Sequence, residues 1–376
     1  MDRLPWAPRL EFWYRVGRRK GTLPAGFQDL TLPEIIRKMG MAHYGVVPDF
    51  TIVGEEADLL DRALGILQAP GVIHRTLLGG TERVVRRNGN QTVVEYRTPV
   101  GSVRTTTVMN EEMLDAGASV AWVSEHPVKT PRDMKVVAHI FAHLEVQPRY
   151  QDFLAWEAEV GDEGVAVAYT STAACAMHHI LKELMPTEEF FFAQHDEPAL
   201  IDELAEAVGN WYQQIRRVGA ESPAEIVLLG ANYDDSITSP PFFRKYILPE
   251  LRSYGEQLHA RGKLLLTHTD GENRRLMPLY LEAGFDIADS VCPAPMTRLS
   301  FEDFRKGFAD RIAIWGGIPS VLFCAGSASF EQFRTSVDDL LARHAGESRW
   351  IVGVSDMVPA DAEFDRLCYI TEKMCG

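Results

Sequence analysis

From about residue 164 onward, short apolar runs recur along the chain, each followed by a loop and a segment with helical periodicity. The runs are VAVAYTS, EIVLLGA, KLLLTHT, DIADSVC, RIAIWGG and WIVGVSD. Continuous apolar strands that alternate with amphipathic helices indicate parallel strands buried on both faces. This alternation restricts the region to an α/β fold more strongly than any single motif does.

The segments between these runs carry start and stop signals of helices. Capping-box patterns begin two of them, at Ser300 with Asp303 and at Ser329 with Gln332. Pro249 lies inside a third segment and should kink that helix, because proline has no amide hydrogen to donate. The sequence therefore predicts helices in regular alternation with the strands.

Two architectures accommodate this alternation: a (β/α)8 TIM-type barrel and an open, doubly wound sheet. No glycine-rich nucleotide-binding loop follows the first strand, and polar residues cluster at the carboxyl ends of nearly all the strands. An active site at a barrel mouth needs such residues, although the switch point of an open sheet also tolerates them. We therefore expect the barrel, with the open sheet as the alternative.

The first part of the chain has a different pattern. Apolar residues at helical spacing predict helices over residues 31–41 and 55–67. The stretch TVVEYRTPVGSVRTTTV alternates around Thr98-Pro99-Val100-Gly101 and predicts a β-hairpin. We expect one domain, 1–376, in which residues 1–125 form a helical N-terminal extension with a β-hairpin insertion and residues 126–376 form the main part of the barrel.

Composition excludes several classes of partner. The formal net charge of -15 disfavours binding to a nucleic-acid backbone. No run of 18 apolar residues exists, so no membrane span is expected, and the N-terminus has no apolar signal-peptide core. The five cysteines show no close pairing, which fits free thiols in a reducing compartment. We expect a cytoplasmic protein.

The sharpest local motif is Thr267-His268-Thr269-Asp270-Gly271, which ends the KLLL run. Because side chains alternate along a strand, His268 and Asp270 should project to the same face at the strand's carboxyl end. An imidazole and a carboxylate so placed could supply two ligands of a zinc site, or a general acid with its orienting carboxylate. The alternative is a structural hydrogen bond between the two side chains.

Other strand ends add polar or small residues to this mouth. They are Asn232, Tyr233, Asp234, Asp235, Cys292, Gly316, Gly317, Ser355 and Asp356. At the paired glycines the missing side chains leave room for a ligand to approach. Single members also have plainer interpretations: Asp235 could form a turn with Ser236, and Cys292 could be a small buried hydrophobic residue.

Three further groups are weaker candidates. His178 and His179 are adjacent on an expected helix, where their side chains diverge, so they should not share a metal. His139 and His143 have the spacing of a chelating pair, but no third ligand is evident. An aromatic cluster, either core or one wall of a pocket, comprises Trp6, Phe12, Trp13 and Tyr14.

Three ordered segments resemble the uroporphyrinogen decarboxylase superfamily. They are SPPFFRKYILPELRSYGEQLHARGKLLLTHTDG, LMPLYLEAGFDIADSVCPAP and RIAIWGGIPSVLFCAGSASFEQF, and the resemblance spans about residues 160–370. It implies a distorted (β/α)8 barrel whose site lies at the carboxyl ends of the strands, in agreement with the pattern of the residues themselves.

The branches of this superfamily differ in their motifs. The decarboxylases carry an Arg-x-x-Gly-Arg-Tyr pattern near the N-terminus, which PRLEFWYRVGRRKGTLP lacks, and an acid-rich site suits an octa-anionic porphyrinogen poorly. The methylcobalamin:thiol methyltransferases carry a zinc-binding His-x-Cys pair and a late cysteine. In this chain Asp270 stands in place of the first cysteine, and the late segment GVSDMVP has none.

The resemblance therefore implies a methyl-donor methyltransferase, the O-demethylase component of a corrinoid system. Such an enzyme moves a methyl group from a small methylated compound, for instance an aromatic methyl ether, to the cob(I)alamin of a separate corrinoid protein. The cobalamin would be carried by that partner, since no corrinoid domain is recognisable in this chain. The alternatives are a decarboxylase, a methylcobalamin:thiol methyltransferase and a non-catalytic corrinoid-binding barrel.

The same resemblance suggests roles for the residues at the mouth. His268 and Asp270 would assist the leaving heteroatom, with or without zinc, and Tyr233 would donate a proton to a leaving oxygen. The expected substrate-binding residues are Asn232, Asp234, Asp235, Asp356 and Gly317. The expected zinc ligands are His268, Asp270 and Cys292.

Overall fold

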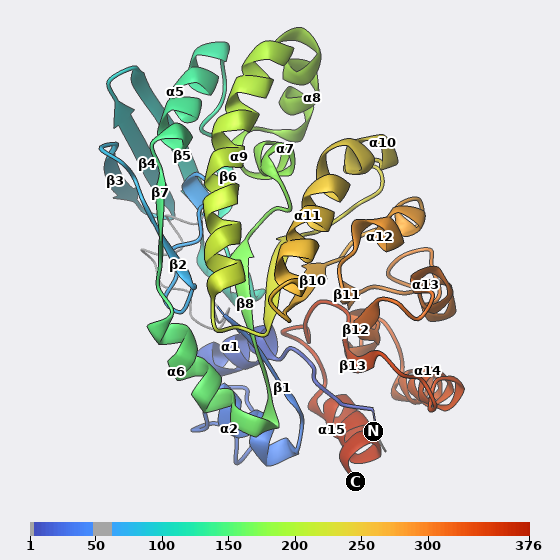
Figure 1. Cartoon of the computed structure of the whole chain (residues 1–376). Helices are drawn as coiled ribbons and strands as arrows, with labels where there is room; N and C mark the ends of the chain where they lie inside the picture. Colours follow the sequence, from blue (N-terminus) through green and yellow to red (C-terminus); the bar gives the residue numbers. More distant parts are fainter. Residues whose placement is uncertain (1–3, 48–61) are drawn as a thin grey trace.

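The computed structural model describes residues 4–47 and 62–376, and a curled parallel sheet is its central element (Figure 1). Each of its seven strands is hydrogen bonded to the next one along the chain. The strands are β1 (His43–Val47), β8 (Gly164–Ser171), β9 (Ile226–Ala231), β10 (Leu264–His268), β11 (Ile287–Val291), β12 (Ala313–Ile318) and β13 (Trp350–Val354). All neighbours are parallel and follow chain order without a reversal, which excludes the doubly wound alternative.

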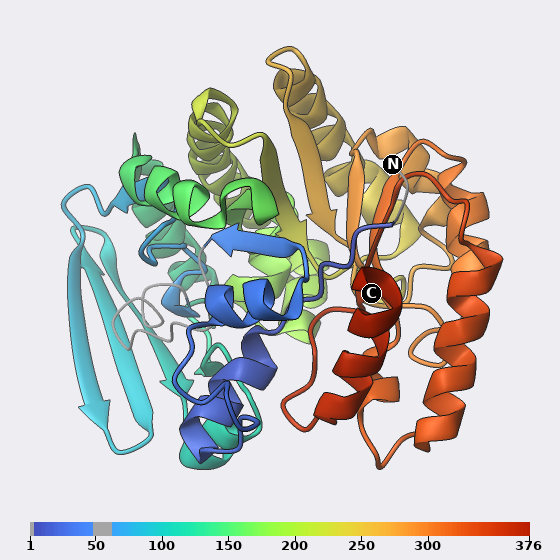
Figure 2. The same ribbon diagram turned by 90° about the horizontal axis from the view of Figure 1, so that it is seen from below.

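A short N-terminal segment joins the two edges of this sheet. The amide of Ala7 donates to the carbonyl of Val352 in β13, and the amide of Val352 donates to the carbonyl of Pro5, both at 2.9 Å. On the other side, the amide of Ala42, which directly precedes β1, donates to the carbonyl of Trp6 at 2.8 Å. Figure 2 shows this blue segment running toward the red C-terminal strand. Within the described residues, the curled sheet thus consists of seven strands and one bridging segment, in place of eight regular strands.

Six of these strands coincide with the apolar runs of the sequence, but β1 does not. It lies within the region that we expected to be an extension, so the sheet begins well before residue 126. The helix predicted over 31–41 is α2 (Leu32–Met39), with a capping box from Thr31 and Glu34. The helix predicted over 55–67 falls largely outside the described residues.

Side-chain alternation along the strands produces two apolar layers. One side packs against the surrounding helices. The other side fills the interior of the curled sheet, through Tyr44, Val46, Val167, Tyr169, Ile226, Leu228, Leu266, Ile287 and Trp315. His268 follows Leu266 by two positions and Asp289 follows Ile287 by two, so both polar side chains enter this interior near the carboxyl ends of the strands.

Helices cover the outside of the sheet (Figure 1). They are α6 (Gln151–Val160), α7 (Ala176–His179), α8 (Thr187–Asp196), α9 (Pro198–Glu221), α10 (Pro240–Phe242), α11 (Leu248–His259), α12 (Met277–Ala283), α13 (Phe301–Phe308), α14 (Phe330–Arg343) and α15 (Phe364–Cys375). The predicted capping boxes begin α13 and α14. A π-helical segment, η3 (Phe243–Ile247), directly precedes α11, so the helix is interrupted next to Pro249, as predicted.

The predicted hairpin forms β4 (Gln91–Thr98) and β5 (Gly101–Val108), with Thr98 paired to Gly101 across the turn. It belongs to a separate antiparallel sheet beside the curled one, completed by β3 (Glu82–Asn88) and β6 (Trp122–Glu125) (Figure 1). The remaining elements are α1 (Glu11–Lys20), β2 (His74–Leu77), α4 (Glu111–Asp115), α5 (Pro131–Ala142) and β7 (Glu145–Pro148). Within the described ranges no helix has the length and apolar character that crossing a membrane requires.

Gly317 lies in close contact with a neighbouring helix. A Cβ atom on Gly317 would lie 2.5 Å from the ring of Phe301 in α13 and 3.3 Å from Nε1 of Trp350. Its φ of +96° also lies in the region that favours glycine. The space that a side chain at this position would take is therefore occupied by Phe301, and ligand binding at Gly317 stays a prediction.

Gly317→Ala should lower the free energy of unfolding by about 1–3 kcal/mol, because the added methyl group meets Phe301 and the backbone favours glycine. Gly346→Ala is the matched control: a Cβ there meets no atom within 4 Å. The control should change stability by no more than about 0.5 kcal/mol. Urea denaturation compares the two variants, and equal losses would contradict this assignment.

Candidate functional site

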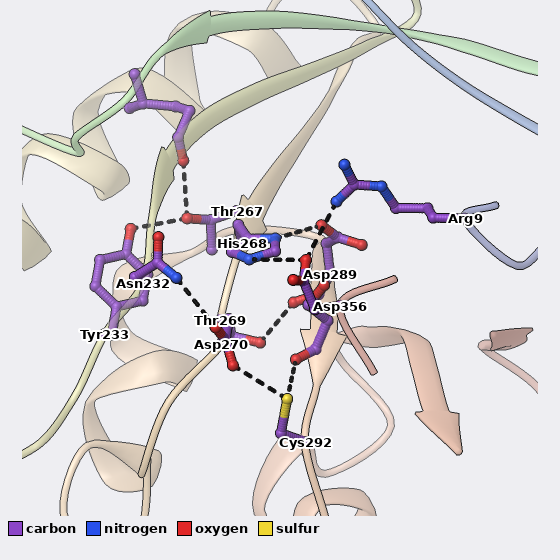
Figure 3. Close-up of polar contacts among 12 residues, drawn as sticks. Arg9, Asn232, Tyr233, Thr267, His268, Thr269, Asp270, Asp289, Cys292 and Asp356 are labelled. Atoms are coloured by element: carbon purple, nitrogen blue, oxygen red, sulfur yellow. Dashed lines mark hydrogen bonds and ion pairs between the residues drawn. The ribbon is translucent and has the colours of Figure 1, made fainter. Parts of the chain in front are cut away.

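His268 and Asp289 form a buried pair at the mouth, by which we mean the carboxyl ends of the strands of the curled sheet. Nδ1 of His268 lies 2.7 Å from Oδ2 of Asp289 (Figure 3). The two residues are direct neighbours in the register of β10 and β11, and Asp289 is only 2% exposed. Because an ionised carboxylate only accepts hydrogen bonds, Nδ1 carries the proton and the other ring nitrogen, Nε2, faces the mouth.

Asp356 and Arg9 complete this group (Figure 3). Nε2 of His268 lies 3.7 Å from Oδ1 of Asp356, and Nη1 of Arg9 lies 3.6 Å from the same oxygen. Both distances exceed a hydrogen bond, so these contacts are ion pairs. Arg9 is buried, whereas the side chain of Asp356 is 36% exposed and forms the solvent-facing side of the group. Among the described residues Nε2 thus has no direct hydrogen-bond partner, so it is available to a substrate atom.

The surrounding charges favour the imidazolium form of His268. Burial opposes that form, but the hydrogen bond and charge of Asp289, with the carboxylates of Asp356 and Asp270, outweigh it and raise the pKa of His268 above its ordinary value of 6.5. Burial also raises the pKa of Asp356, against the charges of His268 and Arg9. The charges around His268 thus favour a proton on its ring, and burial favours the protonated form of Asp356.

Left-handed backbone conformations mark several strand ends at this mouth. Asn232 after β9, Ser290 near the end of β11 and Asp356 after β13 have φ values of +60°, +58° and +61°. Such conformations are unfavourable for residues other than glycine and cluster at functional sites. A register shift between Asp289 and Val291 accompanies the left-handed conformation of Ser290 in β11. These irregularities interrupt the regular alternation of side chains at the strand ends.

Asp270 is not the partner of His268. Its carboxylate accepts from Nδ2 of Asn232 at 3.1 Å and from the thiol of Cys292 at 3.2 Å. The strand ends at His268, so the alternation that placed both side chains on one face does not extend to Asp270. The predicted His268–Asp270 pair is therefore replaced by His268–Asp289.

The residues expected to bind zinc do not converge on one point. Among the residues that the structure describes, no group of three or more His, Cys, Asp or Glu side chains is arranged to hold a metal ion. Burial and the charge of Asp270 raise the pKa of the Cys292 thiol, whereas a zinc ligand must be a thiolate. We derive no metal-assisted step, and zinc binding by His268, Asp270 and Cys292 stays a prediction for metal analysis to test.

Tyr233 lies in the core. It is fully buried, and its hydroxyl group is 2.8 Å from Oγ1 of Thr267. Burial raises the pKa of Tyr233, which keeps the phenol protonated. A side chain so enclosed does not reach a substrate at the mouth, so its expected role as proton donor is not supported by its position.

Asp234 and Asp235 organise the loop after β9. Oδ1 of Asp234 accepts from the amide of Ser236 at 2.9 Å, which is the turn that we had considered for Asp235. Asp235 instead accepts from the amide of Arg275 at 2.8 Å and pairs with its guanidinium at 3.2 Å. Both carboxylates are occupied by these contacts, and only Asn232 and Asp356 of the expected substrate-binding set face the polar group at the mouth.

The weaker candidates have structural roles. The ring of His143 donates to the carbonyl of His139 at 2.7 Å on an exposed face of α5. His178 and His179 are buried, and burial lowers their pKa values to about 3 and about 4, so both are neutral. Trp6 is buried in the core, which favours the core interpretation for that end of the aromatic cluster.

The sequence reasoning missed three polar residues at the mouth. Asp289 had a recognisable pattern, because it follows Ile287 by two positions within an apolar run. Lys182 comes from η2 (Ile180–Leu184), a π-helical segment after β8, and its ammonium group donates to Asn232 at 3.2 Å. Arg9 reaches the mouth because its segment pairs with β13, and no local sequence pattern predicts that contact.

Comparisons with known proteins locate the fold but not the family. No family model matches this chain, and no curated protein sequence matches it either. A solved methyltransferase from Methanosarcina mazei is similar in structure, with a TM-score of 0.51, 12% identity, and coverage of 100% of this chain and 95% of that one. An isomerase from Streptomyces coelicolor A3(2) has a TM-score of only 0.19, at 13% identity over 65% of this chain and 71% of that one, and carries no argument. At 12% identity, the similarity to the methyltransferase establishes a shared fold.

Asp289→Asn should lower the pKa of His268, because the variant removes the nearest negative charge and leaves the burial unchanged. NMR titration of the His268 ring measures this directly. Asp338→Asn is the control, since Asp338 in α14 accepts from Tyr369 and pairs with Lys373, both in α15, and among the described residues has no contact with this group. An unchanged His268 titration in Asp289→Asn would show that Asp289 is not its main charge partner.

Proposed function

We propose that this chain is a corrinoid-dependent methyltransferase of the methyl-donor type. It would take a methyl group from a small methylated compound and transfer it to the cob(I)alamin of a separate corrinoid protein. Two findings support this: the chain shares its fold with a methyltransferase over its whole length, and its sequence resembles the uroporphyrinogen decarboxylase superfamily, which includes such enzymes.

The observation that carries the proposal is the buried contact of His268 with Asp289, which raises the pKa of the ring and leaves Nε2 directed to the mouth. In the proposed step the cobalt nucleophile attacks the methyl carbon, and the carbon–heteroatom bond breaks. The bonding pair leaves with the heteroatom, which takes the proton from Nε2 and departs as a neutral alcohol, phenol or amine. An alkoxide or phenoxide is a poor leaving group, so this proton transfer is where the enzyme lowers the barrier.

Asp289 and Asp356 then have separate tasks. Asp289 fixes the ring orientation and stabilises the imidazolium, as a carboxylate behind a catalytic histidine does in other enzymes. Asp356 is partly exposed and lies 3.7 Å from Nε2, so it can return a proton from solvent after each turnover. The corrinoid acts as the methyl acceptor and belongs to the partner, which should dock transiently through a modest, partly polar interface.

His268→Ala should reduce methyl transfer by about 10²- to 10⁴-fold, the usual contribution of a general acid. The assay follows formation of methylcobalamin from free cob(I)alamin with a panel of aromatic methyl ethers and methylamines. His195→Ala is the control, because that histidine is exposed on α8 and pairs only with Asp196 among the described residues. If wild type methylates no cob(I)alamin but releases carbon dioxide from uroporphyrinogen, the decarboxylase alternative takes its place.

The pH dependence should have a definite sign. A general acid works only while protonated, so the rate constant for an ether donor should fall as pH rises through the raised pKa of His268. In Asp289→Asn the same fall should begin at lower pH. A quaternary ammonium donor leaves as a neutral amine without needing a proton, so its rate should lack this limb. A rate that instead rises over this range would assign His268 as a base.

A further inference from the structure

A surface groove runs between α5 and α9 and shares no residue with the mouth. The two helices pack side by side (Figure 1), and the groove between them has a volume of about 670 Å³. Two buried alanines, Ala138 of α5 and Ala207 of α9, form its floor, and Val100 at the tip of the β-hairpin lines it with half of its surface exposed. The small side chains on the floor leave the groove open to atoms of another molecule.

The two walls of this α5–α9 groove carry charges of opposite sign. On each helix the lining residues recur at spacings of three and four, which places them on one face of that helix. The α5 wall presents Arg132, Lys135 and His139, and the α9 wall presents Glu203, Glu206 and Asn210. A positive and a negative surface thus flank a single groove.

These charges have no partner of opposite sign in the part of the chain that the structure describes. The side chains of Arg132, Lys135, Glu203 and Glu206 are exposed, and none of them forms an ion pair or a hydrogen bond there. The two walls do not pair with each other across the groove, so both are available to a second molecule. An exposed ion pair contributes little, but complementary charges across an interface select the partner and its orientation.

Contacts beyond the groove establish how the two helices run relative to each other. The ring of Phe141 in α5 lies 5.4 Å from the ring of Trp211 in α9. Three residues further along each segment, Gln214 donates to the carbonyl of Leu144 at 3.2 Å. Because both contacts have the same offset in residue number, α5 and α9 run in the same direction, and their residues advance together along the groove.

This register makes the groove complementary to itself. Extended about two helical turns toward the N-termini, the same offset places Arg132 close to the level of Glu203 and Lys135 close to the level of Glu206. A two-fold rotation about an axis along the groove exchanges its two walls and keeps each level unchanged. The basic wall of one copy would then face the acidic wall of the other, and this contact would occur twice.

We propose that the α5–α9 groove is the interface of a homodimer, in which a second copy of this chain packs its own groove against the first. Arg132 and Lys135 of each copy pair with the two glutamates of the other copy's α9 wall. The occupant is a second copy because one surface supplies both signs of charge, whereas a uniformly acidic or basic partner would match one wall and be repelled by the other.

The overall charge of the chain makes this arrangement necessary for association. With a formal net charge of -15, two copies repel each other unless a basic surface of one is aligned with an acidic surface of the other. The inference goes beyond the proposed function and does not depend on it, because no residue of the groove takes part in the proposed methyl transfer.

Sedimentation velocity over a series of micromolar protein concentrations tests the dimer. Wild type should shift from monomer to dimer as its concentration rises. Lys135→Glu and Glu206→Lys should each raise the dissociation constant at least about 10-fold, because each replaces two attractive contacts of the dimer by two repulsive ones. Lys306→Glu is the matched control: it makes the same charge change at an exposed lysine of α13 that does not line the groove, and it should leave association unchanged.

An equimolar mixture of Lys135→Glu and Glu206→Lys tests the pairing of the walls. In the mixed dimer one contact is the native pair, and the other is the same pair with its charges exchanged, so association should return to about the wild-type level. Such a recovery also shows that both variants are folded. A wild type that stays monomeric, a dimer that neither charge reversal weakens, or a mixture that associates as poorly as its components would overturn the inference.

Discussion

The backbone pairing of residues 5–7 with Val352 is the constraint on which the site depends. It joins β13 to the segment that contacts Ala42 before β1, so both edges of the curled sheet are engaged. Beyond this pairing, the carbonyl of Arg9 accepts from the amide of Val358 at 2.8 Å. Arg9 is thereby fixed against the segment that carries Asp356, and a cation from the N-terminus enters a site built from C-terminal strands.

That cation matters because the mouth gathers negative charge inside the protein. Buried carboxylates are costly unless they are paired or hydrogen bonded. Asp289 has His268 as its hydrogen-bond partner, and Asp356 has His268 and Arg9 as its ion-pair partners. Asp270 has Asn232 and Cys292. Each carboxylate is therefore accounted for, and the proton on His268 is part of the charge balance as well as of the proposed chemistry.

Much of the fold could be predicted from the sequence, and the site only in part. Six strands were recognisable because burial on both faces makes parallel strands continuously apolar. His268, Cys292 and Asp356 were placed at one mouth for the same reason. The strand β1 was not predicted, because its sequence HYGVV is short and starts with a histidine.

The errors within the site have a common physical cause. The alternation of side chains along a strand did not apply to Asp270, because β10 ends at His268. The same alternation would have indicated Asp289, which lies within β11, but it was not applied there. Arg9 and Lys182 depend on contacts between segments far apart in the chain, which no local pattern encodes. At Gly317 the missing side chain indicates a close approach, but the sequence does not identify the approaching group, and in the structure the ring of Phe301 lies there.

The most direct test of the central claim is a crystal structure of the protein with a demethylated product, a phenol, bound at the mouth. The account predicts that the phenolic oxygen lies within hydrogen-bond distance, about 3 Å, of Nε2 of His268, which remains bonded to Asp289 through Nδ1. A product whose phenolic oxygen faces any other group, with Nε2 of His268 bonded only to Asp356, would contradict it.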